Sequence, residues 1–206
     1  KTTLAWDVQK RDKDILDKIS KAVSSTYPIS LHRNASFRLR IHNQMFVQSA
    51  ITRGLLPKKN MRNILPVIPS EFVRHFVRGY LEGDGWIVLR NGRNEADIGF
   101  ASGNQSFLEL LSKTITRFLK IETSRVRKRI KVTPRGVTAT TFMLEFYSSN
   151  AFKIAKWLYG DLKQDDICLE RKYKNYLRIK KLYDFLLSGG RKARVIQKNQ
   201  GKTIKE

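Results

Sequence analysis

The chain has 206 residues, 41% of them hydrophobic and 10% aromatic, which is enough for a buried core and excludes a wholly disordered tail. It carries 41 Lys and Arg against 18 Asp and Glu, a formal net charge of +23 at pH 7. Such a surplus destabilises a compact fold by self-repulsion, so it indicates a polyanionic partner, most simply a nucleic acid. The alternatives are a merely soluble basic surface or an anionic membrane. No lipidation signal, basic amphipathic helix or apolar run of about 18 residues stands out, so we expect no membrane partner.

The few cysteines and histidines limit the disulfides and the histidine-based metal or nuclease sites that these residues can form. The single cysteine, Cys168, excludes a disulfide within these residues and indicates a reducing intracellular compartment, such as a bacterial or phage cytoplasm or an organelle. We expect it to pack as a small apolar residue on a C-terminal helix. The histidines His32, His42 and His75 have no zinc-ligand or His-Asn-His nuclease spacing.

The first part of the chain, residues 4–61, predicts a strand, a helix, two strands and a helix, followed by a turn. In the last of these predicted strands, the apolar residues Phe37, Leu39 and Ile41 alternate with Arg38, Arg40 and His42. A period of two predicts a sheet with one buried face and one basic face.

A short proline-containing linker, residues 65–70, leads into a predicted helix over about 70–84, with Ser70 as a candidate N-cap. Gly79 and Gly83 lie four residues apart on one face of this helix. Each costs about 1 kcal/mol relative to alanine, so the pair indicates close approach of another backbone. Asp84 ends the helix, where the helix dipole disfavours a negative charge. A carboxylate there is often a cation ligand, although an ordinary Gly-Asp-Gly turn remains the plain alternative.

The nine residues from Val77 to Gly85 closely resemble the signature helix of LAGLIDADG homing endonucleases. The resemblance implies that two such helices pack along a pseudo-two-fold axis. It also implies that their last acidic residues bind Mg²⁺ or another divalent cation over the scissile phosphates, a role that falls here on Asp84. Glu82 lies about 200° around the helix from Asp84, so we expect it to be structural or solvent-facing.

The next predicted strand begins at Trp86, and the resemblance places Trp86, Val88 and Arg90 on a DNA-binding face. Trp86 departs from the family, in which this position is usually small. A hairpin loop, residues 91–94, follows. A second alternating segment places Arg125, Arg127, Arg129 and Lys131 on one strand face, as in β-ribbon readers of the major groove. The alternative is that these basic side chains only protect a sheet edge from aggregation.

Residues 96–172 repeat the order of elements in residues 4–61. In this comparison Trp6–Leu16 matches Ile98–Leu108, and the triplet from Phe37 to Ile41 matches the triplet from Phe142 to Phe146. We therefore predict an α+β fold of tandem pseudo-symmetric αββαββα units with antiparallel DNA-binding sheets. The first unit, residues 1–66, lacks its opening helix and hairpin. The second unit covers residues 67–187 and a basic tail covers residues 188–206. We expect the chain to be part of a longer two-motif protein.

The resemblance also implies further catalytic positions. Lys59 and Lys172 correspond to the family's peripheral basic residues, and Lys10 and Ser102 to strand-to-helix positions that line the water pocket. For the two first-named lysines, ordinary solvated side chains remain the alternative.

Three functions stay open from the sequence. The favoured one is an intron-encoded, site-specific endonuclease for double-stranded DNA, a pseudo-two-fold monomer when complete. The second is a catalytically degenerate binding protein of the same fold, such as a regulator or a maturase acting on intron RNA. The third, an unrelated basic protein of ribosomal type, requires neither the repeat nor the signature helix. Because one carboxylate is half of a site, we expect these residues alone to bind DNA but to cleave it poorly.

Overall fold

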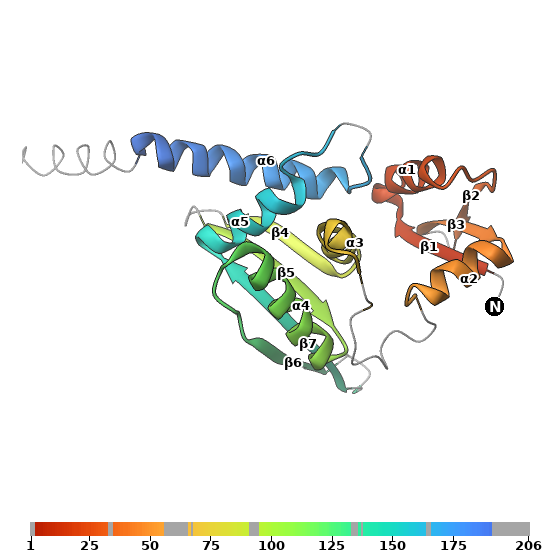
Figure 1. Ribbon diagram of the computed structural model, residues 1–206, viewed down its shortest axis with the longest axis horizontal. Coiled ribbons are helices and arrows are strands. Elements are labelled where there is room, and N and C mark those ends of the chain that lie inside the picture. The colour runs from red at the N-terminus through yellow and green to blue at the C-terminus, as the bar shows by residue number, and fades with distance from the viewer. Residues whose placement is uncertain are drawn as a thin grey trace, which may run out of the picture.

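The computed structural model describes residues 3–32, 35–55, 66, 68–90, 95–132, 136, 138–163 and 166–190. Its first unit contains β1 (Thr3–Gln9), a 3-10 turn η1 (Lys10–Asp12), α1 (Asp14–Ala22), β2 (Ile29–His32), β3 (Ser36–His42) and α2 (Gln44–Thr52). The strands form an antiparallel sheet of order β1-β3-β2 (Figure 1). The helix α2 starts where the side chain of Asn43 accepts a hydrogen bond from the amide of Phe46, a normal N-cap.

The second unit begins with a 3-10 turn η3 (Ser70–Phe72) and continues as α3 (Val73–Asp84), β4 (Gly85–Arg90), β5 (Glu95–Ser102), α4 (Gln105–Leu119), β6 (Val126–Val132), β7 (Thr138–Tyr147), α5 (Ser148–Tyr159), α6 (Glu170–Phe185) and a π-helical turn η4 (Leu186–Gly190). Its sheet has the order β4-β5-β7-β6 and is antiparallel throughout.

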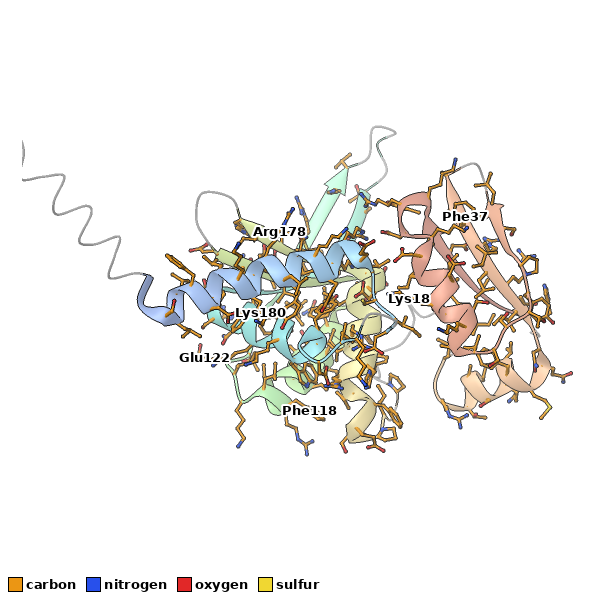
Figure 2. The ribbon with its side chains drawn as sticks, turned by 90° about the horizontal axis from the view of Figure 1, so that it is seen from above. Lys18, Phe37, Phe118, Glu122, Arg178 and Lys180 are labelled. Atoms are coloured by element: carbon orange, nitrogen blue, oxygen red, sulfur yellow. The ribbon has the colours of Figure 1, made fainter. Side chains whose placement is uncertain are left out.

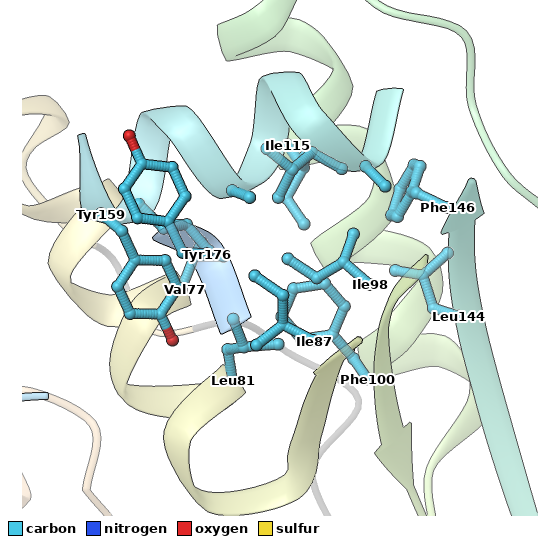
Figure 3. Packing of buried hydrophobic residues seen from close by; sticks show 14 of the residues in the cluster. Val77, Leu81, Ile87, Ile98, Phe100, Ile115, Leu144, Phe146, Tyr159 and Tyr176 are labelled. Atoms are coloured by element: carbon cyan, nitrogen blue, oxygen red, sulfur yellow. The ribbon is translucent and has the colours of Figure 1, made fainter. Parts of the chain in front are cut away.

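Helices cover one face of the second sheet, and the main core lies between them and the strands (Figures 1 and 3). Alternate strand residues such as Ile98, Phe100 and Leu144 are fully buried there against Leu108 of α4 and Val77 of α3. Burying a side chain of this kind contributes about 1.5–3 kcal/mol. A smaller core in the first unit contains Leu16, Leu39 and Ile41. Each sheet therefore keeps its other face open.

The two sheets have corresponding topologies, which confirms the predicted fold class. The order β1-β3-β2 repeats as β5-β7-β6, and β4 is an additional edge strand supplied by the hairpin after α3. The ladder corrects the predicted register, however. Val8 stands opposite Phe37, whereas Ser102 stands opposite Phe142. If those phenylalanines correspond, Ser102 matches Val8 and not Lys10.

The turn η1 explains this two-residue shift, because four residues, 10–13, separate β1 from α1, whereas only two residues, 103 and 104, separate β5 from α4. Other boundaries also differ from the prediction. Ser70 begins η3 rather than capping α3, whose N-cap residue Phe72 makes no side-chain cap hydrogen bond. The last helix starts at Glu170, so the buried Cys168 precedes this helix rather than lying on it as predicted.

Within the described ranges, no helix combines the length and the apolar character needed to cross a bilayer.

Candidate nucleic-acid interface and metal-binding helix end

Asp84 is the exposed last residue of α3, at the point where the helix passes directly into β4. The junction is made by Gly85, whose backbone is already extended, with φ −126° and ψ 179°. A Cβ on Gly85 would lie 2.6 Å from Leu81 Cδ1 and 2.7 Å from the carbonyl oxygen of Gly99. Only a glycine allows so tight a passage, and it holds the Asp84 carboxylate at the start of a sheet strand.

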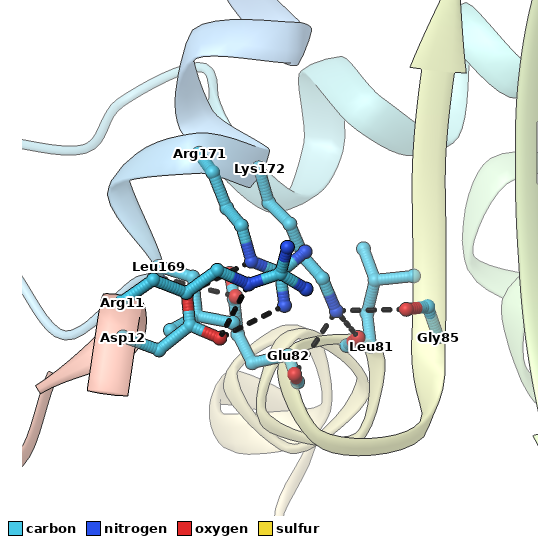
Figure 4. A network of polar contacts seen from close by, with 8 residues as sticks. All are labelled: Arg11, Asp12, Leu81, Glu82, Gly85, Leu169, Arg171 and Lys172. Atoms are coloured by element: carbon cyan, nitrogen blue, oxygen red, sulfur yellow. Dashed lines mark hydrogen bonds and ion pairs between the residues drawn. The ribbon is translucent and has the colours of Figure 1, made fainter. Parts of the chain in front are cut away.

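Lys172 fixes this junction from α6. Its ammonium group donates hydrogen bonds to the carbonyl oxygens of Leu81, of Glu82 at 2.9 Å and of Gly85 at 2.8 Å (Figure 4). These carbonyls belong to the end of α3 and the start of β4, where helical partners are missing. Burial lowers the pKa of Lys172 from 10.5 to about 8, an effect that the nearby Glu82 carboxylate opposes.

The geometry assigns Lys172 a structural part in the site. The side chain is 2% exposed, and its three N–H donors have three carbonyl acceptors. It is therefore not a solvated surface lysine. Its charge opposes the negative end of the α3 dipole, which is a favourable place for a cation.

Glu82 is buried and structural, so the solvent-facing alternative was wrong. Its carboxylate accepts hydrogen bonds from the Tyr159 hydroxyl at 2.6 Å and from the Leu169 amide at 3.1 Å. Burial raises the pKa of Glu82, and the Tyr159 hydrogen bond opposes that rise. Glu82 thereby ties α3 to α5 and to the start of α6, facing away from Asp84.

The two units touch through side chains at the N-terminal end of α6. Arg171 donates to both oxygens of the buried Asp12, at 2.8 Å and 3.1 Å (Figure 4). The same carboxylate raises the pKa of Arg171. Lys18 of α1 donates to the carbonyl oxygen of Asp166 at 3.1 Å, on the side of α1 that faces the second unit (Figure 2). Arg171, which contacts the first unit, is therefore next in the chain to Lys172, which donates hydrogen bonds at the end of α3.

The open face of the second sheet contains the side chains predicted for it. The ladder puts Trp86, Val88 and Arg90 on this face, because Ile87 and Leu89 pair with the buried residues of β5. The basic β6 residues on the same face are Arg127, Arg129 and Lys131. Arg125 lies just before β6 and is exposed.

Sequence reasoning missed the acidic residues on this face. Glu95 and Asp97 of β5 and Glu145 of β7 share it, so the face is basic along β6 and mixed in charge near β4. Trp86 is half-buried rather than fully exposed, because its ring lies on Gly99, where a Cβ would come within 2.1 Å of Trp86 Cζ2. The sequence shows which residues of one strand share a face. It does not show which residues of the neighbouring strands lie beside them.

The open face of the first sheet carries Arg38, Arg40 and His42, as predicted. Arg38 donates from Nε and Nη2 to the two carboxylate oxygens of Asp7 on β1, at 2.5 Å and 2.8 Å. The Asp7 hydrogen bond raises the pKa of Arg38, and the Arg38 hydrogen bond lowers the pKa of Asp7. His42 shares a hydrogen bond with the Thr3 hydroxyl at 2.9 Å.

Part of the second unit matches a known protein family in sequence. Residues 71–155, from η3 into α5, match the family model described as the LAGLIDADG-like domain.

Solved structures extend the likeness in fold. A mutant of I-SmaMI is 13% identical with a TM-score of 0.56, over 99% of this chain and 87% of that one. The LAGLIDADG meganuclease I-CpaMI bound to uncleaved DNA is 13% identical with a TM-score of 0.54, over 91% and 81%. The LAGLIDADG homing endonuclease I-LtrWI bound to target DNA is 12% identical with a TM-score of 0.52, over 90% and 80%. The chain thus has the LAGLIDADG endonuclease fold.

One curated relative matches in sequence. It is a probable translation initiation factor IF-2 of Thermococcus kodakarensis, 31% identical over 97 residues, or 46% of this chain. The matched segment spans 8% of that protein's length.

The structure does not bring the remaining predicted site residues together. Gly79 and Gly83 are exposed, and a Cβ on either would meet nothing within 4 Å, so neither lies at a helix interface within the described chain. The helix α3 packs into its own unit through Val77 and Leu81, which turns the glycines outward. Lys10 is exposed in η1, and Ser102 ends β5.

Two further predicted features, Lys59 and the hairpin loop over 91–94, lie outside the described residues. Across the ranges that the structure describes, no three His, Cys, Asp or Glu side chains are grouped to hold a metal ion.

Proposed function

We propose that this LAGLIDADG-like protein is a site-specific endonuclease for double-stranded DNA, with Asp84 as one carboxylate of a divalent-metal site. Duplex DNA lies along the open sheet faces, where Arg38, Arg127 and Arg129 contact phosphates and bases. Proteins of the same fold have been crystallised with DNA, which supports this choice of partner.

The observation that carries the proposal is the position of Asp84. An exposed carboxylate ends the signature helix and is followed at once by the strand that presents Trp86 and Arg90 on the open face. Metal-dependent cleavage of DNA commonly uses a carboxylate to hold the cation beside the bound backbone, and this junction supplies one. The rigid passage at Gly85 and the Lys172 cap hold it there.

The residues present fit half of a magnesium site. Mg²⁺ keeps several waters and takes one or two protein carboxylates together with phosphate oxygens, which suits a single exposed aspartate. When bound, the cation would polarise the phosphate and activate water. The chain's own part is to orient the Asp84 oxygens, through the hydrogen bonds that Lys172 donates to the carbonyls on either side of Asp84.

A second acidic helix would complete the site. The glycine face of α3, at Gly79 and Gly83, is open to accept a closely packed helix. We propose that the complete enzyme is a monomer in which such a helix packs there with pseudo-two-fold symmetry. The residues described here would then bind DNA and cleave it poorly when alone.

Across the described residues, no three potential metal ligands are grouped, which favours a second candidate, a binding protein of the same fold. Its ligand would be DNA, as for a regulator, or intron RNA, as for a maturase. The genomic setting separates these candidates cheaply, since an enclosing intron favours homing and a free-standing position favours regulation.

The test is Mg²⁺-dependent cleavage of a duplex DNA target library by the longest reading frame that contains this chain. Its Asp84→Asn variant should lose cleavage and keep binding. Glu122→Gln is the matched control, because Glu122 is an exposed carboxylate at the opposite end of the second unit from the first (Figure 2). Cleavage that survives Asp84→Asn would refute the metal role. Binding without any cleavage by the unaltered protein would favour the second candidate.

A further inference from the structure

Arg90 on β4 is held by a carboxylate on the neighbouring strand. Its Nε and Nη2 donate to Asp97 Oδ2 at 3.2 Å and 2.6 Å. The guanidinium carbon also lies 5.4 Å from the centre of the Tyr147 ring, within the range of a cation–π contact. In the ladder, Asp97 stands between Val88 and Tyr147, so Arg90 reaches diagonally across the open face.

The pair is asymmetric in exposure. The Asp97 side chain is 5% exposed although it lies on the open face, whereas the Arg90 side chain is 40% exposed. The other carboxylate oxygen, Asp97 Oδ1, is buried and has no hydrogen-bond partner among the described residues. Among the described residues, Arg90 is the side chain that donates hydrogen bonds to this buried carboxylate, and the hydrogen bond with Asp97 raises the pKa of Arg90.

Among the described residues, Arg90 donates hydrogen bonds from one edge of its guanidinium and keeps a second edge available. A guanidinium has five N–H donors in a flat fork. Asp97 accepts from the edge formed by Nε and Nη2, so the end formed by Nη1 and Nη2 can still donate in parallel. Such an edge matches the O6 and N7 acceptors of guanine in the major groove.

The first sheet repeats the device. Arg38 donates to Asp7 from the same Nε and Nη2 edge, again across neighbouring strands of an open face. Each sheet therefore carries one arginine–aspartate pair with the same guanidinium edge engaged.

We propose that Arg90 is a specificity-determining residue that reads guanine in the major groove, and that Asp97 and Tyr147 are positioning residues that fix its orientation. This inference rests on the proposed DNA-binding function. Arg38 with Asp7 has the same part on the first sheet. Fixing the fork before binding reduces the side-chain entropy lost on contact, which favours guanine over any base that lacks two acceptors at that position.

The experiment is selection of bound sequences from a randomised duplex DNA library, with a metal chelator present so that no cleavage occurs. The full chain should select a motif that includes guanine. Arg90→Gln should reduce the guanine preference at one position by roughly tenfold and leave the other positions unchanged. Asp97→Asn should weaken preference at that same position. Arg117→Gln, which removes an exposed arginine from α4, should leave the motif unchanged.

Arg90→Lys keeps a charge beside the buried Asp97 and separates base reading from phosphate contact. A lysine is a point charge without the fixed two-pronged edge of arginine. If Arg90 reads the base through that edge, the guanine preference in Arg90→Lys should stay below that of the unaltered chain, while the overall affinity falls less than in Arg90→Gln. Restored preference, or a motif unchanged in Arg90→Gln, would overturn the inference while leaving the proposed function intact. If the unaltered chain selects no motif, site-specific binding fails and the inference fails with it.

Discussion

Replacing Lys172 with methionine tests how the signature helix is held. The change removes a buried ammonium and leaves the carbonyl oxygens of Leu81, Glu82 and Gly85 without their donor. Hydrogen bonds from a charged donor contribute about 1.5–3 kcal/mol each, but burial of the charge offsets much of that. We expect Lys172→Met to lower the free energy of unfolding at pH 7 by about 3 kcal/mol, the usual cost of removing one partner from a buried charged contact.

The dependence on pH has a defined sign. The folded-state pKa of Lys172 is about 8, against an ordinary value of 10.5, so burial of its charge is a cost that is fully present below pH 8. Between those two values the unfolded chain binds more protons than the folded one, and stability rises with pH. The difference of 2.5 pKa values corresponds to about 3 kcal/mol. The stability gap between the unaltered chain and Lys172→Met should therefore widen from pH 8 to pH 10.5.

The assay is urea unfolding followed by circular dichroism at several pH values. Lys174→Met is the matched control, because Lys174 lies on the same helix, is exposed, and pairs with Glu170 at the surface. That variant should change stability by less than about 1 kcal/mol at every pH. The reasoning fails if Lys172→Met matches the control at pH 7, or if the gap narrows as the pH rises.

Three other predictions concern the contact between units, the Trp86 platform and the basic strand. Arg171→Gln should destabilise by about 2 kcal/mol because it leaves the buried Asp12 carboxylate with the more distant Arg11, at 4.0 Å, whereas Asp12→Asn should cost about 1 kcal/mol because Arg171 can reach solvent. Equal losses in urea unfolding would contradict this assignment. Gly99→Ala should push the Trp86 ring off the sheet and shift its fluorescence to longer wavelength, which an unchanged spectrum would disprove. Affinity for duplex DNA should fall steeply with salt, and glutamine at three β6 positions should reduce the log–log slope by about 0.9 for each lost phosphate contact. An equally steep slope in that variant would place the contacts elsewhere. The three positions are Arg127, Arg129 and Lys131.

Local patterns allowed much of the fold to be predicted. The glycine spacing and the terminal carboxylate located α3 and its junction with β4, and strand alternation sorted the β3 and β6 side chains onto their faces. These features depend only on residues that are close together in the chain, so the sequence alone is enough to predict them. The match of the LAGLIDADG-like domain to residues 71–155 covers the same signature.

Features that depend on distant neighbours were missed. Asp97 and Asp7 gain their parts only because particular strands lie side by side, and no local pattern reveals which oxygen meets which guanidinium. Lys172 was predicted as a peripheral basic residue, and its burial at the end of α3, where α6 packs against β4, could not be read from the sequence. The two-residue error at Lys10 arose because a 3-10 turn intervenes between β1 and α1.

The measurement that tests the account most directly is lysine acetylation of the chain with and without duplex DNA, read by mass spectrometry at low salt. If DNA lies on the open sheet face, Lys131 of β6 should be protected, while Lys113 of α4 and Lys156 of α5 should react as in the free protein. Protection of the two helical lysines with Lys131 still reactive would contradict the placement of DNA on the sheet.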